Sequence, residues 1–246
     1  MDKDGIWRQN RILIMLLRWL IMKNILRYPA LTFLFVVSLV LAGCSKGQAA
    51  PQLREGDILF QITDSSQSRA IQLGTGSKYT HCGIVLEKDG RLQVFEAISK
   101  VGWMPVDTWI NRGIKSHYVV MRLKDTSVLT PEVIRAMRAD TAYFSGKDYD
   151  LLFQWSDTKI YCSELVWKLY KRNAKISVGA IRTFADYDLD HAVVKKIIRD
   201  RYGLNFKLDE KVVAPSDIME SSLLEVVQDS RADKNGAGRK KTEKRG

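Results

Sequence analysis

Cys162 is the residue of this 246-residue chain whose surroundings most favour nucleophilic chemistry. It lies near the start of a helix predicted over residues 157–171, and apolar side chains follow it three, four, seven and eight positions later. A thiol in the first turn of a helix meets unpaired backbone N–H groups and the positive end of the helix dipole, and both favour the reactive thiolate. The same N–H groups can stabilise an oxyanion. The alternative is a buried core cysteine without chemistry, the commoner state of a free thiol.

His81 and Glu96 are candidates for a base and for the group that orients it. The Asp-Gly pair at residues 89–90 predicts a two-residue hairpin turn. In the resulting register Gly83 faces Glu96, and His81 lies on the same sheet face as a diagonal neighbour, about 7–8 Å away between backbones. Gly83 leaves room for the carboxylate to lean toward the imidazole and fix its tautomer. A register shifted by one residue would put the two side chains on opposite faces, and the alternative is an ordinary surface pair.

The other cysteines and histidines are not expected to act in catalysis. Cys82 alternates to the sheet face opposite His81, so we expect a core residue that is poorly placed to bond with Cys162. His117 and His191 have no partner pattern and are expected at the surface. The sequence contains no CxxC, HExxH or GxSxG pattern, so it predicts neither a disulfide framework, nor a metal site, nor another cofactor.

The elements that must position these residues indicate an α+β domain, because strands cluster in the first half of the chain and helices in the second. A loop containing Trp103, Pro105 and Trp109 separates the third predicted strand from the fourth. The predicted strands cover residues 58–62, 79–86, 91–98 and 118–123, and the predicted helices cover residues 68–73, 131–146, 157–171 and 187–201.

The N-terminus has the pattern of a targeting segment. Residues 31–42 form an unbroken apolar run, and Leu41-Ala42-Gly43-Cys44 has the pattern of a lipobox, in which the cysteine sulfur receives a diacylglycerol. An uncleaved transmembrane helix is the alternative, but the run is short for a membrane span. We therefore expect a signal peptide over residues 1–43, with translation starting at Met22 or with an extended first segment.

The mature chain is expected to begin at the lipidated Cys44. A tether over residues 44–52 leads to the folded domain over residues 53–228, and a basic, disordered tail covers residues 229–246. Attachment by several acyl chains anchors a protein firmly to a membrane. By resemblance to enterobacterial sorting, Ser45 after the cysteine favours the outer membrane of the cell envelope, facing the periplasm.

The formal net charge of +11 is concentrated at the two ends of the chain. Residues 1–43 carry a net +4 and residues 231–246 a net +5, which leaves +2 for the stretch between them. A nearly neutral domain is not expected to bind nucleic acid.

The order and spacing of these motifs resemble those of the permuted papain-like amidases of the YaeF/YiiX type, which are relatives of the NlpC-type cell-wall peptidases. The resemblance runs from about Leu53 to Asp217. It rests on the segments Gly56-Asp57-Ile58-Leu59-Phe60, Ser77-Lys78-Tyr79-Thr80-His81 with Gly83, Phe95-Glu96-Ala97, Gly146-Lys147-Asp148-Tyr149-Asp150, Tyr161-Cys162-Ser163-Glu164-Leu165-Val166 and Val213-Ala214-Pro215-Ser216-Asp217.

This resemblance implies a circularly permuted fold, with a small antiparallel sheet or partial barrel packed on helices. It also implies Cys162 as nucleophile, His81 as general base and Glu96 as the third member, with the histidine before the cysteine, the reverse of papain. Two departures stand out: Cys82 follows the histidine, and Lys147-Asp148 replaces a proline that related chains often have before the tyrosine. We expect the second departure to alter the substrate groove.

The sequence thus predicts a cysteine-dependent amide hydrolase, an amidase or peptidase, that works through an acyl-thioester intermediate. Asp57, Tyr79 and Tyr161 are expected to contact the substrate, which is a small amide, a peptide or an acyl lipid. The only other expected partner is the membrane, through the N-terminal lipid. Two alternatives remain open: an acyltransferase or lipid-modifying enzyme that uses the same Cys–His pair, and a non-catalytic lipoprotein that binds an envelope ligand.

Overall fold

The computed structural model describes residues 52–231. The predicted signal peptide, the lipidation site at Cys44, the tether up to residue 51 and the tail from residue 232 lie outside the described residues. No helix between residues 52 and 231 combines the length and the apolar character that a membrane crossing requires.

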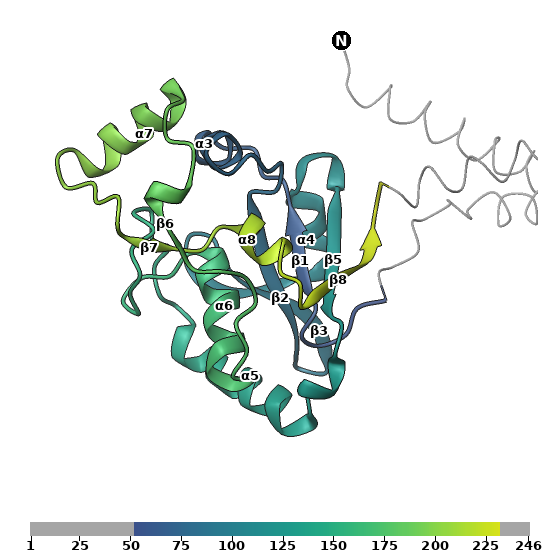
Figure 1. The fold of residues 1–246 in the computed structure, drawn as a ribbon. Coiled ribbons are helices and arrows are strands. Elements are labelled where there is room, and N and C mark those ends of the chain that lie inside the picture. The colour runs from purple at the N-terminus through teal and green to yellow at the C-terminus, as the bar shows by residue number, and fades with distance from the viewer. Residues whose placement is uncertain (1–51, 232–246) are drawn as a thin grey trace, which may run out of the picture. The chain divides into compact units, whose positions relative to one another are not determined.

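A six-stranded sheet with the order β4-β3-β2-β1-β5-β8 forms the centre of the domain (Figure 1). All neighbouring strands in it are antiparallel. Its strands are β1 (Ile58–Gln61), β2 (His81–Lys88), β3 (Arg91–Ala97), β4 (Val101–Pro105), β5 (Tyr118–Leu123) and β8 (Leu224–Asp229). A separate two-stranded ribbon pairs β6 (Arg182–Thr183) with β7 (Lys211–Val212).

The helices surround this sheet on both faces and at one end. They are α3 (Ser66–Thr75), α4 (Val106–Arg112), α5 (Pro131–Phe144), α6 (Cys162–Asn173), α7 (Ala192–Tyr202) and α8 (Pro215–Met219). Three short 3-10 turns, Ile114–Ser116, Thr126–Val128 and Phe184–Asp186, connect them.

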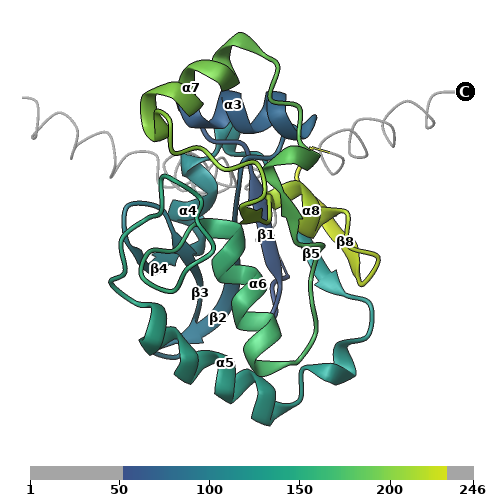
Figure 2. The same ribbon diagram turned by 60° about the vertical axis from the view of Figure 1, so that its left-hand side comes forward.

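The alternation of side chains along the strands creates two hydrophobic clusters, one on each face of the sheet. Helices α5 and α6 cover the larger cluster, which contains Cys82, Ile84 and Phe95 (Figure 2). Helix α4 covers the smaller one, where Trp109 packs with Val85 and Val94. Residues of β2 and β3 that are adjacent in sequence therefore lie against different helices.

The helix ends follow local chemistry that the sequence carries. The side chain of Thr130 accepts a hydrogen bond from the N–H of Val133, and Pro131 occupies the first turn of α5. Gly203 follows the last residue of α7. At the start of α6 the carboxylate of Glu164 accepts a hydrogen bond from the N–H of Tyr161 at 3.4 Å, which favours the helix beginning at that point.

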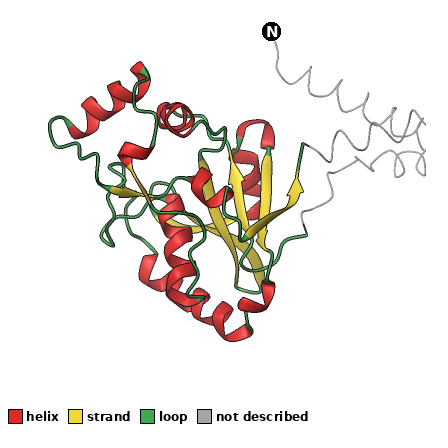
Figure 3. Cartoon of the chain, in the orientation of Figure 1, coloured by secondary structure: helices red, strands yellow, loops and turns green. Residues whose placement is uncertain are grey.

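The α+β class is confirmed, and every predicted strand and helix is present, with ends shifted by a few residues (Figure 3). The prediction of a loop around Trp103, Pro105 and Trp109 is wrong, because β4 and α4 occupy most of that segment. The short strands β6 and β7, helix α8 and strand β8 were not predicted either.

The folded chain also extends beyond the predicted start of the tail at residue 229. Strand β8 includes Asp229, and the buried Ser230 accepts a hydrogen bond from the N–H of Tyr118 at 3.1 Å. The expectation that His117 is a surface residue is wrong for the same reason. Its side chain is buried and its Nε2 atom lies 3.0 Å from Oδ1 of Asp229, because β8 returns from the far end of the chain to pair with β5.

Candidate active site

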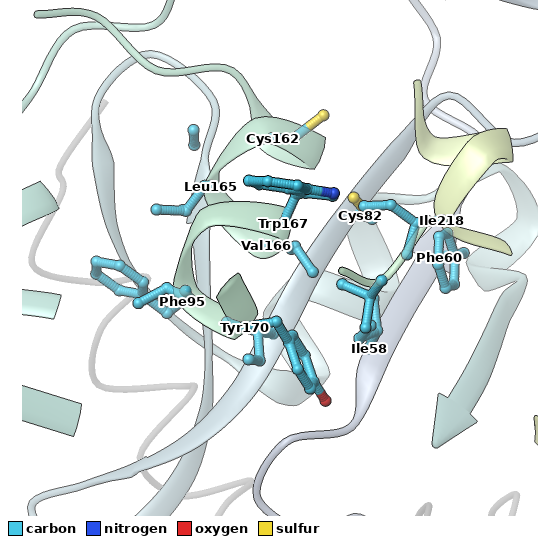
Figure 4. Packing of buried hydrophobic residues seen from close by; sticks show 14 of the residues in the cluster. Ile58, Phe60, Cys82, Phe95, Cys162, Leu165, Val166, Trp167, Tyr170 and Ile218 are labelled. Carbon is cyan, nitrogen blue, oxygen red and sulfur yellow. The ribbon is translucent and has the colours of Figure 1, made fainter. Parts of the chain in front are cut away.

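Cys162 is the first residue of α6, where the helix packs on the sheet. Figure 4 shows its side chain at the end of the helix, with Leu165 and Val166 further along the same helix. The first N–H groups of a helix have no intrahelical partner, so the thiol stands beside backbone donors and the positive end of the helix dipole. The structure therefore gives Cys162 the position that its spacing predicts.

His81 and Glu96 come together as the hairpin argument predicts. Lys88 pairs with Arg91 across the turn, so the predicted register is confirmed. Nε2 of His81 lies 2.5 Å from Oε2 of Glu96, and both side chains are almost completely buried. A side chain at Gly83 would collide with its neighbours, because an added Cβ would lie 2.4 Å from a methyl carbon of Val94 and 3.3 Å from Cβ of Glu96.

The carboxylate of Glu96 is held by α4 as well as by the imidazole. Trp109 donates its indole N–H to Oε2 at 2.8 Å, and Arg112 donates from both terminal nitrogens of its guanidinium, with NH1 2.8 Å from Oε1. The rings of Trp109 and His81 also stack, with 6.0 Å between their centroids. Burial raises the pKa of Glu96, but His81 and then Arg112 outweigh this effect and lower it to about 2.

Trp109 and Arg112 are functional candidates that the sequence reasoning missed. They are three positions apart, and therefore share one face of α4. The available signal was the segment after Pro105, where an aromatic and a basic residue recur at helical spacing. This spacing is informative only if the segment is predicted to be a helix, whereas a loop was predicted there.

Electrostatics couples His81 to Cys162. Burial lowers the pKa of His81, but the negative charge of Cys162 and a hydrogen bond with it, followed by Glu96, raise it to about 9. The pKa of Cys162 is lowered well below its usual value by a hydrogen bond with Cys82 and, against the cost of burial, by the positive charge of His81. The pair therefore favours a thiolate and an imidazolium at neutral pH.

Cys82 lies close enough to Cys162 to interact with its thiol, a contact that the sequence did not predict. Cys82 belongs to the core and points to the opposite sheet face from Glu96, as predicted, but α6 covers that face and brings Cys162 to it. His81, the first residue of β2, reaches the thiol from the end of the strand. Both cysteines are free thiols. Burial and then Cys162 raise the pKa of Cys82, so it stays protonated.

Tyr149 and Gln67 complete the surroundings of Cys162, and neither was predicted as a site residue. Nε2 of Gln67 donates a hydrogen bond to the hydroxyl of Tyr149 at 3.0 Å. Burial and then the negative charge of Cys162 raise the pKa of Tyr149 well above its usual value, so the hydroxyl keeps its proton. The signal for Tyr149 was its place in the Gly146–Asp150 motif, whereas Gln67 lies in a polar segment that gave no signal.

A cavity opens beside Cys162 and encloses about 820 Å³, including its mouth. Residues of α3 and α7 form its walls, and the start of α6 with residues 212–215 forms the rest. Of the three predicted substrate contacts, only Tyr161 lines this cavity. Its ring packs edge-on against Phe153, while its hydroxyl accepts a hydrogen bond from the N–H of Val213 at 3.1 Å.

Asp57 and Tyr79 are not among the residues that line the cavity. Asp57 is fully buried, and its two oxygens each lie 2.7 Å from a guanidinium nitrogen of Arg122. Tyr79 is buried between Phe60 and His117. The environments of Asp57 and Tyr79 are those of structural residues, because their side chains are already engaged within the protein.

Comparisons with known proteins agree with this fold. Residues 52–228 match a family model described as permuted papain-like amidase enzyme, YaeF/YiiX, C92 family. The protein YiiX of Escherichia coli strain K12 is 38% identical over 176 residues, which cover 72% of this chain and 86% of that protein. A crystal structure of YiiX from Escherichia coli O157:H7 superposes with a TM-score of 0.69 at 38% identity, over 73% of this chain and 98% of that one.

That crystal structure is described as one of a metalloprotein. Residues 52–231 of the present chain bring together no group of three or more His, Cys, Asp or Glu side chains arranged to hold a metal ion. In addition, the carboxylate beside His81 is already bound by the cationic Arg112. The donor set described here therefore does not fit a metal, and we derive no reaction step through one. The family match and the shared fold show that this chain belongs to the permuted papain-like amidases of the YaeF/YiiX type.

Proposed function

We propose that this protein is a cysteine-dependent amide hydrolase of the cell envelope, with Cys162 as nucleophile, His81 as base and acid, and Glu96 as the group that orients the imidazole. The observation that carries the proposal is the position of His81, which bonds to Glu96 through Nε2 and interacts with the thiol of Cys162. The amidase family supports the class of reaction. The lipobox that ends at Cys44 supports the cell envelope as its location.

The proposed reaction starts from the thiolate and the imidazolium that the pKa shifts of Cys162 and His81 favour. The thiolate attacks the carbonyl carbon of the amide, and a carbon–sulfur bond forms. The carbon–nitrogen bond then breaks as His81 gives its proton to the leaving amine. Neutral His81 next takes a proton from water, which attacks the thioester, releases the carboxylic acid and restores the starting pair.

Two sets of donors can stabilise the oxyanion of the tetrahedral intermediate. The first consists of the backbone N–H groups at the start of α6, including that of Cys162. The second is the hydroxyl of Tyr149, which accepts a hydrogen bond from Gln67 and therefore has its own proton left to donate. We propose that Tyr149 acts together with the helix N-terminus in this role.

The experiment that tests the proposal measures turnover of a panel of amides and esters by the purified protein and by the variant Cys162→Ala. We expect hydrolysis by the wild type, none by the variant, and a thioester adduct on the peptide that contains Cys162. Cys82 provides an internal control in the same digest, since its raised pKa predicts no adduct. Full activity of Cys162→Ala would refute the mechanism. Adding an amine acceptor to the same assay separates hydrolysis from acyl transfer.

A further inference from the structure

The cavity beside Cys162 has a chemical character that the catalytic groups do not explain. Helices α3 and α7 lie next to each other at one end of the domain and form its two walls (Figure 2). Aliphatic side chains line both walls, including Ala70 and Ile71 from α3 and Val194, Ile197 and Ile198 from α7.

The polar side chains of the lining, Cys162 aside, already have hydrogen-bond partners inside the protein. The hydroxyls of Tyr187 and Tyr202 donate to Asp217 and to the carbonyl of Leu152, and that of Ser163 donates to the carbonyl of Val213. The remaining polar side chains are also engaged: Gln67 with Tyr149, Thr75 with the carbonyl of Ile71, Tyr161 with the N–H of Val213, and Arg201 with the carbonyl of Leu151.

A cavity with these walls disfavours the binding of polar ligands. A sugar or a charged peptide would lose its water in the cavity and find few free partners there, which is unfavourable. An unbranched aliphatic chain loses nothing by leaving water and gains from each buried methylene. Cys162 lies at the cavity lining, so a chain that fills the cavity can place an attached carbonyl at the sulfur.

We propose that the cavity binds the aliphatic acyl chain of the substrate, so that the enzyme acts on long-chain acyl amides or esters. This inference rests on the proposed function, because it names the substrate class of the same site. In the reaction the fatty acyl group passes from the nitrogen or oxygen of the leaving group to the sulfur of Cys162. The proton of His81 goes to that leaving group, and water then releases the fatty acid.

The test measures kcat/KM for a series of N-acyl amides of one amine, with acyl chains from two to sixteen carbons, below their micelle concentrations. We expect kcat/KM to rise roughly three- to fourfold for each added methylene until the chain fills the cavity. A second series keeps an acetyl group and lengthens the amine. A preference confined to this second series would overturn the proposal, since the cavity would then hold the leaving group.

Two variants of α7 test the cavity directly. Ile197→Trp fills it, whereas Val193→Trp adds the same side chain four residues earlier at a position that is 41% exposed and outside the lining. We expect Ile197→Trp to lower the ratio of kcat/KM for the sixteen-carbon substrate to that for the two-carbon substrate at least tenfold. Val193→Trp should leave this ratio unchanged.

If Ile197→Trp fails to fold, Ala70→Phe on α3 repeats the test from the opposite wall, with Arg69→Phe at an exposed neighbouring position as its control. Equal effects of the lining and control variants on the long-chain substrate would overturn the proposal. Hydrolysis by the wild type without any chain-length preference would also overturn it, while leaving the proposed function intact. Absence of Cys162-dependent hydrolysis for every chain length would instead refute the proposed function.

Discussion

Oε2 of Glu96 lies 2.5 Å from Nε2 of His81, inside a part of the domain that is almost closed to water. Because Glu96 keeps its negative charge, Nε2 carries a proton and donates a hydrogen bond to the carboxylate. Nδ1 is then the ring nitrogen left for the thiol of Cys162. The contact therefore fixes both the orientation and the tautomer of the imidazole.

The variant Glu96→Gln tests this relationship. We expect kcat to fall about 100- to 10,000-fold, because a neutral amide neither fixes the tautomer nor stabilises the imidazolium. The fall in activity at alkaline pH should also move to lower pH, since Glu96 helps to raise the pKa of His81. The measurements are steady-state kinetics and the pH profile of kcat/KM. Glu87→Gln is the control, because Glu87 is half-exposed and lies on the partner strand. Equal effects of both substitutions would contradict the role of Glu96.

The coupling of Cys162 and His81 predicts how alkylation and activity depend on pH. Iodoacetamide should modify Cys162 at pH 6 almost as fast as at pH 8, because the lowered pKa already gives a thiolate there. Hydrolysis should fall as pH rises through about 9, where His81 loses the proton that the leaving amine needs. An alkylation rate that rises about tenfold per pH unit between pH 6 and 8 would be that of an ordinary thiol, with a pKa of about 8.5, and would contradict the ion pair.

The same shifts predict the pH range in which the site stabilises the fold. The pKa of His81 is raised in the folded state. Its contribution to the free energy of unfolding is therefore fully present below its unfolded pKa of about 6.5 and is lost as pH rises through about 9. The pKa of Glu96 is lowered, so its contribution is present above about 4.3 and is lost as pH falls toward about 2. Melting temperatures of the wild type and Glu96→Gln between pH 2 and 10 should therefore differ most at about pH 5–7. A difference that does not change with pH would contradict this linkage.

Gly83 and Gly102 provide a matched pair of substitutions on either side of Glu96. Gly102 pairs with Glu96 across the sheet, yet a Cβ added there meets nothing within 4 Å, whereas one at Gly83 would collide with Val94. We expect Gly83→Ala to destabilise the domain by about 1–3 kcal/mol and to reduce activity by displacing Glu96. Gly102→Ala should stay within about 0.5 kcal/mol of the wild type. Chemical denaturation measures both. Equal stability of the two variants would show that the close packing at Gly83 is unimportant.

The sequence was sufficient to predict contacts whose geometry is determined by local signals. It was insufficient to predict contacts between segments far apart in the chain. An Asp-Gly turn sets the register of a hairpin, so the contact between His81 and Glu96 could be predicted. The donors Trp109 and Arg112 could not, because their approach to Glu96 depends on how β4 leads into α4. The nearness of Cys82 to Cys162 also escaped prediction, since strand alternation does not say which sheet face a distant helix covers.

Tyr149→Phe tests the proposed oxyanion donor. The substitution removes one hydroxyl, which accepts a hydrogen bond from Gln67 and faces the reactive sulfur. We expect kcat to fall about 100-fold, because removal of one oxyanion donor raises the barrier of the acylation step, while KM changes little.

Tyr143→Phe is the matched control for this prediction. Tyr143 is 46% exposed, and its hydroxyl donates to the carboxylate of Asp157 on the protein surface. A Tyr149→Phe variant with the kcat of the control would leave the backbone N–H groups at the start of α6 as the oxyanion donors. A rise in KM with unchanged kcat would instead indicate that Tyr149 binds the substrate in its ground state.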